Sequence, residues 1–172
     1  MRRNTVDRIL QGAIALLLVG LLWVVNDTMR ERVVVVGDDA PDFSITAENG
    51  RTITPTSFGG RLLVLNFWAT WCPPCVDEVP SLEKFHRTLA GKGVVVLGIS
   101  VDKDAAVYKR FIDQTKISFA TARDDGKRIN LDYGTVKFPE TYIISKGKVV
   151  RKIISSRDWM DPEMIRDVES LL

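Results

Sequence analysis

The chain contains two cysteines, and both lie in one short motif, Cys72-Pro73-Pro74-Cys75. The run Leu62–Trp68, just upstream, is apolar and has the length and composition of a central strand. A helical pattern follows the motif through residues 78–89. A cysteine pair between a strand and a helix is the arrangement in which this motif serves redox chemistry. The motif therefore predicts an α/β fold in which a strand leads directly into a helix.

The start of a helix favours the reactive form of a cysteine. The positive end of the helix dipole and free backbone N–H groups stabilise a thiolate, the species that attacks a disulfide, so Cys72 is the expected nucleophile. Pro73 and Pro74 carry no N–H, which leaves the Cys75 amide as the nearest backbone donor to the Cys72 sulfur. We therefore expect the pKa of Cys72 to be lowered less than in the most acidic motifs. Cys75, one turn further in, is the expected resolving thiol, which closes a bridge to Cys72 and releases a mixed disulfide.

Other uses of the cysteine pair fit the sequence less well. A structural zinc site needs more ligands than two cysteines and the single histidine, His86, supply. A structural disulfide across two intervening residues would constrain little of the unfolded chain. Buried, inert thiols remain open, because free cysteine is often a core residue. The spacing and the position at a strand-to-helix junction favour the redox interpretation.

The rest of the chain alternates strands and helices. Val94–Val101 is a second apolar strand, and a strand, a helix and a strand imply a parallel pair with a right-handed crossover. Before them, strands at 43–47 and 51–54 are expected to form a hairpin around Asn49-Gly50. The later elements are expected to be a helix capped by Asp102 or Asp104 and ending near Gln114, a strand at 119–121, a helix at 126–133, a hairpin of strands 140–145 and 148–154, and a terminal helix opened by Asp161-Pro162.

An apolar segment near the N-terminus is the expected membrane anchor. Ile9–Val25 runs for about 17 residues without a charge, at the short end of what spans a bilayer as a helix. It lacks the polar stripe of a buried amphipathic helix, and no small-x-small cleavage site follows it, so we expect an uncleaved span. Arg2, Arg3 and Arg8 precede the segment, which places the N-terminus in the cytoplasm and the remaining chain on the oxidising side.

The composition excludes several classes of protein. The chain has 24 Lys+Arg against 22 Asp+Glu, and this net charge of +2 is too weak a field for a nucleic-acid binder. With 45% hydrophobic and 27% charged residues, the chain is neither disordered nor collagen-like. A domain of this length can bury an adequate core without a disulfide framework.

The sequence Asn66-Phe67-Trp68-Ala69-Thr70-Trp71-Cys72-Pro73-Pro74-Cys75, with Pro80 beyond it, resembles the thioredoxin superfamily. The apolar N-terminal segment and Glu78 make the chain similar to the membrane-anchored ResA, TlpA and CcmG type. The resemblance implies a thioredoxin-like α/β fold, with a central mixed β-sheet flanked by helices, an N-terminal β-hairpin and one preceding transmembrane helix. The expected organisation is a transmembrane anchor at 1–29, a linker at 30–37 and a thioredoxin-like domain at 38–172.

The resemblance also implies roles for individual residues. Cys72 and Cys75 match the attacking and resolving cysteines of the redox-active disulfide. Pro139 matches the cis-proline that lies opposite this disulfide and exposes backbone groups to an extended peptide. Phe138, before it, is larger than the residue usual in the family, which affects the shape of the groove. The expected substrate-binding residues are Trp71, Pro73, Pro74, Phe138 and Pro139.

Glu78 follows Cys75 by three residues, on the same side of the helix. Its carboxyl group could exchange a proton with the resolving thiol if burial raises its pKa. It could equally be an anion favoured in the first turns of a helix, and spacing alone leaves both roles open. The resemblance favours the proton role, because Glu78 matches the acidic residue of ResA-like proteins. Asn66 stands where ordinary thioredoxins carry a buried Asp, which leaves Glu78 as the nearby acid of the motif.

The resemblance implies a membrane-anchored, extracytoplasmic thiol-disulfide oxidoreductase that reduces partner disulfides, such as apocytochrome c cysteine pairs in cytochrome c maturation. The expected partners are a cysteine-containing extracytoplasmic protein and a membrane thiol-disulfide electron donor, on the periplasmic side of a bacterial cell membrane. No cofactor, metal or nucleic acid is expected. One alternative is a copper-site thiol reductase or copper-binding module, because soft thiolates suit Cu(I). A peroxiredoxin-type peroxidase fits less well, since Leu65 and Thr70 depart from its Pro-x-x-x-Thr-x-x-Cys frame.

Overall fold

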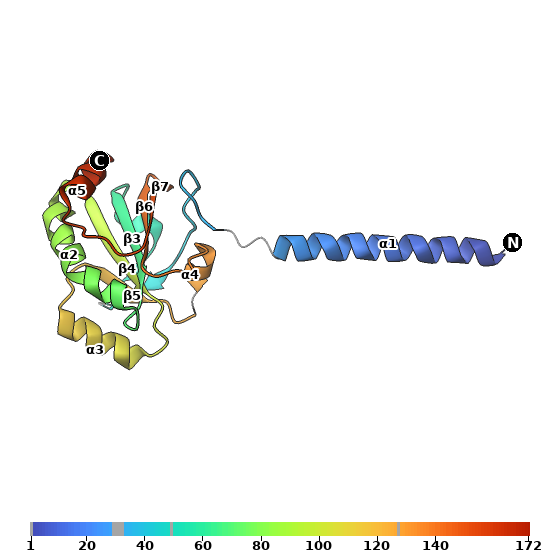
Figure 1. Ribbon diagram of the computed structural model, residues 1–172, viewed down its shortest axis with the longest axis horizontal. Helices are drawn as coiled ribbons and strands as arrows, with labels where there is room; N and C mark the ends of the chain where they lie inside the picture. The colour runs from blue at the N-terminus through green and yellow to red at the C-terminus, as the bar shows by residue number, and fades with distance from the viewer. Residues whose placement is uncertain (1, 29–32, 49, 127) are drawn as a thin grey trace. The chain divides into compact units, whose positions relative to one another are not determined.

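The computed structural model describes residues 2–28, 33–48, 50–126 and 128–172 (Figure 1). The chain divides into two units, Met1–Arg32 and Val33–Leu172. The first unit contains helix α1 (Arg2–Thr28), in which Asp7–Val25 is long and apolar enough to cross a membrane. Residues 30–32 of the expected linker and Asn49 of the expected hairpin turn lie outside the described residues.

The second unit is built on a mixed sheet of five strands in the order β5-β4-β3-β6-β7 (Figure 1). Strands β3, β4 and β5 are parallel, whereas β6 is antiparallel to β3 and β7 is antiparallel to β6. Every residue of β3 is buried, as expected for a central strand covered on both faces. The strands are β3 (Leu62–Trp68), β4 (Val94–Ser100), β5 (Ala120–Arg123), β6 (Glu140–Ser145) and β7 (Lys148–Ile154).

Layers of helices and loops cover the two faces of the sheet. On one face, a core cluster contains Leu82 and Phe85 of α2 (Pro73–Leu89) and Val168 of α5 (Pro162–Glu169). A second cluster, around the cysteines, contains Tyr108 of α3 (Ala105–Thr115). On the other face, a third cluster contains Ile129 of α4 (Arg128–Asp132). That cluster is completed from β1 (Ile45–Thr46), β2 (Thr52–Ile53) and the short helix η1 (Pro55–Phe58); a further short helix, η2 (Ala90–Lys92), follows α2.

Several element boundaries differ from the expectation. The hairpin strands β1 and β2 are only two residues long each. Beyond them, the amide of Ala47 still donates to the carbonyl oxygen of Arg51 across the turn, and Ala47 also bridges Ala122 at the edge of the main sheet. Asp104, not Asp102, caps α3, accepting hydrogen bonds from the amides of Ala106 and Val107. Helix α4 (Arg128–Asp132) ends before the expected residue 133, and residue 127 of the expected 126–133 lies outside the described residues. Strands β3, β6 and β7 have the expected bounds.

The segment just after residue 32 packs against the domain. Val34 is buried, and its amide donates to the carbonyl oxygen of Tyr133 at 3.2 Å. The ammonium group of Lys152 donates to the carbonyl oxygen of Val34 at 2.9 Å and forms a buried ion pair with Glu140. Val34, in the segment 30–37 that the sequence assigned to a linker, therefore contributes to the core of the second unit.

Candidate active site

The cysteine pair lies where β3 passes into α2. Cys72 is the N-cap of α2, with an extended backbone (φ −104°), and Pro73 and Pro74 are its first helical residues. Cys72 and Cys75 form a disulfide, and their Cα atoms are 5.3 Å apart. Cys72 retains 5% exposure whereas Cys75 is fully buried. This asymmetry matches an attacking cysteine nearer the surface and a resolving cysteine behind it.

In the oxidised protein, the backbone N–H groups at the start of α2 donate to the carbonyl oxygen of Cys72 and not to its sulfur. The amides of Cys75 and Val76 donate to the carbonyl oxygen of Cys72 at 3.0 and 3.1 Å. The Cys75 amide, expected to be the nearest donor to the Cys72 sulfur, thus serves the carbonyl group instead. Because Pro73 and Pro74 have no N–H, local hydrogen bonds to the sulfur are scarce.

Glu78 is buried on the inward side of α2, with 3% exposure. The side chain of Asn66 donates to its Oε1 at 2.9 Å. The indole N–H of Trp159 and the amide of Arg157 each donate to Oε2 at 3.3 Å. Burial raises the pKa of Glu78 above its usual value, and the three hydrogen bonds oppose that rise. Glu78 is thus a buried, hydrogen-bonded carboxyl group with a raised pKa, which is the condition that the proton role requires.

A hydrogen-bonded chain links Glu78 to the strand that follows Pro139. The Asn66 amide group that donates to Glu78 also donates to the hydroxyl of Thr141 at 2.9 Å. Asn66 and Thr141 are register partners on β3 and β6. Glu78 and Asn66 were expected from the sequence, but Trp159 was not. Trp159 lies 81 positions after Glu78, and no local pattern in the sequence indicates a contact between them.

Two loops meet at the surface next to Cys72. Trp71 is 61% exposed, and its ring contacts the half-buried ring of Phe138 edge to face, with centroids 5.9 Å apart. The Phe138–Pro139 peptide bond is cis, as the resemblance implies. Pro73 and Pro74 are exposed. Of the five residues expected to bind substrate, Trp71 directly precedes Cys72, and Pro73 and Pro74 lie between the two cysteines. Phe138 and Pro139 lie in the loop whose Phe138 ring contacts Trp71.

The backbone of Phe138 is free to pair with another chain. Among the described residues, its N–H and C=O groups form no hydrogen bond, whereas the carbonyl oxygen of the next residue, Pro139, accepts from Ser155. An unpaired backbone segment beside a reactive disulfide can receive an extended peptide as an added strand.

The described part of the chain contains no group of three or more His, Cys, Asp or Glu side chains arranged to hold a metal ion. His86 lies in the last turn of α2 and is half-buried against Phe119, with ring centroids 6.1 Å apart. Burial lowers the pKa of His86. The histidine packs against Phe119 near the C-terminal end of α2, whereas the cysteine pair lies at the N-terminal end of the same helix.

Comparisons with known proteins agree with this site. Residues 36–153 match the AhpC/TSA family. The chain is 34% identical to the thiol-disulfide oxidoreductase ResA of Bacillus thuringiensis over 125 residues, which cover 72% of each chain. It is 34% identical over 149 residues to the thioredoxin-like protein YneN of Bacillus subtilis, covering 84% of this chain and 87% of that one. A crystal structure of a DsbE thiol:disulfide interchange protein from Chlorobium tepidum superposes with a TM-score of 0.74 at 24% identity, covering 80% of this chain and 98% of that one. The expected thioredoxin-like fold is confirmed.

Proposed function

We propose that this chain, which belongs to the AhpC/TSA thioredoxin-like family, is a membrane-anchored reductant of partner-protein disulfides. It is a thiol-disulfide oxidoreductase of the ResA and DsbE type. The observation that carries the proposal is the disulfide-forming pair Cys72–Cys75 at the start of α2, with the buried carboxyl group of Glu78 one turn further along the helix.

Two exchange steps account for the reduction. The Cys72 thiolate attacks one sulfur of the partner disulfide, forms a mixed disulfide and releases the other partner sulfur as a thiolate. The Cys75 thiol then loses its proton and attacks the Cys72 sulfur, which releases the second partner thiolate and closes the Cys72–Cys75 bridge. Two electrons pass to the partner in total. Because Cys75 is fully buried, its attack is confined to the intramolecular step.

Glu78 is the proposed acceptor of the proton that Cys75 releases. Cys75 and Glu78 are three residues apart on one face of α2, and both are buried. A carboxyl group with a raised pKa is a better base for a thiol than an ordinary exposed carboxylate, since its pKa lies closer to that of the thiol. The donors Asn66 and Trp159 hold the carboxylate in place while it exchanges the proton.

Partner peptides are proposed to dock across the loop of Phe138 and Pro139. The free N–H and C=O of Phe138 would pair with an extended chain. The exposed ring of Trp71 and the half-buried ring of Phe138, together with Pro73 and Pro74, would supply apolar contact. The proposed partner class is an extracytoplasmic protein with a cysteine pair, such as the haem-binding pair of an apocytochrome c. Reducing equivalents would come from a membrane thiol-disulfide donor.

Helix α1 is the proposed anchor. Its apolar stretch Asp7–Val25 has the length of a single span, and the arginines at the N-terminal end favour a cytoplasmic N-terminus. The second unit would then face the extracytoplasmic side of a bacterial cell membrane, where disulfides persist and a dedicated reductant has substrates.

A peptide assay tests the proposal. The full chain, in detergent micelles and fully reduced, is mixed with a peptide that holds a Cys-x-x-Cys-His disulfide, and released peptide thiols are counted over time. We expect stoichiometric reduction by the wild type and accumulation of a mixed disulfide with Cys75→Ser. Cys72→Ser is the control and should be inactive. A peptide that stays oxidised with the wild type, or is reduced equally by Cys72→Ser, would refute the proposal.

A further inference from the structure

A buried carboxylate holds the loop that leads into Cys72. Asp102 lies just beyond the end of β4, with 2% exposure. Its Oδ2 accepts from the amide of Thr70 at 3.0 Å, and its Oδ1 accepts from the hydroxyl of Thr70 at 2.7 Å. The hydroxyl of Ser100 donates to Oδ2 at 2.6 Å. Thr70 is two residues before Cys72, so Asp102 fixes the backbone from which the nucleophile projects.

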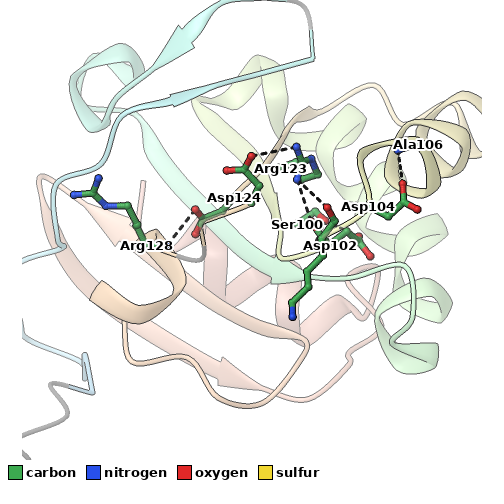
Figure 2. Close-up of polar contacts among 9 residues, drawn as sticks. Ser100, Asp102, Asp104, Ala106, Arg123, Asp124 and Arg128 are labelled. Atoms are coloured by element: carbon green, nitrogen blue, oxygen red, sulfur yellow. Dashed lines mark hydrogen bonds and ion pairs between the residues drawn. The ribbon is translucent and has the colours of Figure 1, made fainter.

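No cation neutralises this carboxylate among the described residues. Its three donors are two hydroxyls and a backbone amide, all uncharged. The nearby guanidinium group of Arg123 donates instead to the backbone carbonyl oxygen of Asp102 (Figure 2). It also donates to the carbonyl oxygen of Lys103 and to the carboxylate of Asp125. The Asp102 side chain is therefore buried among uncharged donors alone, which is a costly place for a carboxylate.

Helix capping does not explain Asp102. The amides at the start of α3 are capped by Asp104, which accepts from Ala106 (Figure 2). It also accepts from the amide of Val107. A second buried carboxylate at the same end of the sheet, Asp124, accepts from three amides at the start of α4. Asp124 is thus a cap with a local structural role, whereas the hydrogen bonds of the Asp102 carboxylate to Thr70 reach across 32 positions to the active-site loop.

We propose that Asp102 is a positioning residue for thiol exchange, which fixes the loop carrying Cys72 and sets a buried negative charge near its sulfur, so that the reduced protein becomes a stronger electron donor. This inference rests on the proposed role of Cys72 as the nucleophile. A negative charge near the sulfur disfavours the thiolate, destabilises the reduced form and makes the reduction potential more negative.

The distance between the Asp102 carboxylate and the Cys72 sulfur determines how far the charge shifts the pKa of Cys72. The Cα atoms of residues 70 and 72 are separated by at most about 7 Å, which puts the Asp102 carboxylate on the order of 10 Å from the Cys72 sulfur. At that separation in a protein interior, one charge shifts the pKa of another group by about one unit. Removal of the Asp102 charge should therefore lower the pKa of Cys72 by about one unit.

The test uses Asp102→Asn, with Asp124→Asn as the matched control for loss of a buried carboxylate. The pKa of Cys72 is measured in the Cys75→Ser background from the pH dependence of alkylation, with the full chain in micelles. Reduction potentials are measured in the two-cysteine proteins at a pH above the pKa of Cys72. For Asp102→Asn we expect the lower pKa and a tenfold shift of the redox equilibrium, or about 30 mV, toward a weaker reductant. For Asp124→Asn we expect both values to equal those of the wild type.

An unchanged pKa and potential in Asp102→Asn, or equal shifts in the two variants, would overturn the inference and leave the proposed function intact. An unreactive Cys72 in the Cys75→Ser parent would instead overturn the proposed function. If Asp102→Asn does not fold, Ser100→Ala is the second test. This variant keeps the Asp102 carboxylate and its contacts to Thr70, but it removes the Ser100 hydroxyl, which donates a hydrogen bond to that carboxylate. The pKa of Cys72 should then rise, and an unchanged value would count against the inference.

Discussion

Replacing Glu78 with Gln should change how the stability of the oxidised protein depends on pH. Glutamine fills the same volume, and its oxygen can accept from both Arg157 and Trp159 as Oε2 of Glu78 does. Its NH2 group would face Asn66, whose amide can turn so that its oxygen accepts from glutamine and from the hydroxyl of Thr141. The substitution therefore removes a titrating group and leaves the hydrogen-bond network complete.

The sign follows from the raised pKa of Glu78. Because burial raises the pKa in the folded state above the value of 4.5 expected when unfolded, the folded protein binds more protons between those two pKa values. The stability that this group contributes is fully present below the unfolded pKa and is lost as the pH rises through the folded pKa. Each unit by which the pKa is raised corresponds to about 1.4 kcal/mol of unfolding free energy. That amount shifts the midpoint of thermal unfolding by about 5 °C in a domain of this size.

The assay is thermal unfolding of the oxidised full chain in micelles between pH 4 and pH 8, followed by tryptophan fluorescence. We expect the midpoint of Glu78→Gln, relative to the wild type, to rise with pH through this window and then level off. Asp77→Asn, at the exposed neighbouring position, is the control and should show no such rise. A difference between Glu78→Gln and the wild type that is constant with pH, or that falls as the pH rises, would refute the reasoning.

Three further substitutions test other parts of the account. Trp71→Ala removes an exposed ring whose aromatic contact is to Phe138, so it should raise KM for a disulfide peptide several-fold in steady-state assays and leave the unfolding midpoint unchanged; a large loss of stability would contradict this. Lys152→Met leaves Glu140 buried without its cation and should cost about 3 to 5 kcal/mol in chemical unfolding, so a neutral result would show that the ion pair is dispensable. Ser155→Gly should stabilise the protein by about 1 kcal/mol, because Ser155 adopts a left-handed conformation (φ 83°); lower stability would show that its side chain matters more than its backbone.

The fold was largely predictable where the pattern is local. Strands β3, β6 and β7 have their expected bounds because each is a run with strand-forming residues bounded by turn residues. The hairpin strands β1 and β2 are shorter than expected, and the bridge of Ala47 to Ala122, which joins the hairpin to the main sheet, links distant parts of the chain. Local pattern carries no information on such a bridge.

In the active site, too, the residues placed by local sequence pattern could be predicted and those brought together by the tertiary fold could not. The motif predicted the position of Cys72 at the start of α2, because the motif marks the junction of a strand and a helix. The partners of Glu78 could not be predicted, because Trp159 approaches it only when the tertiary structure forms. Asp102 was ambiguous for another reason: it and Asp104 are equally good helix caps by sequence, and only the fold decides between them.

The equilibrium reduction potential of the full chain distinguishes a protein that reduces partner disulfides from one that oxidises partner thiols. The protein is titrated against a dithiol buffer, and Cys75→Ser, which cannot close the bridge, is the control. The account predicts a potential near or below that of thioredoxin, about −270 mV, as required of a protein that reduces its partners. A potential close to about −120 mV would contradict it, because such a protein would donate its disulfide and oxidise them.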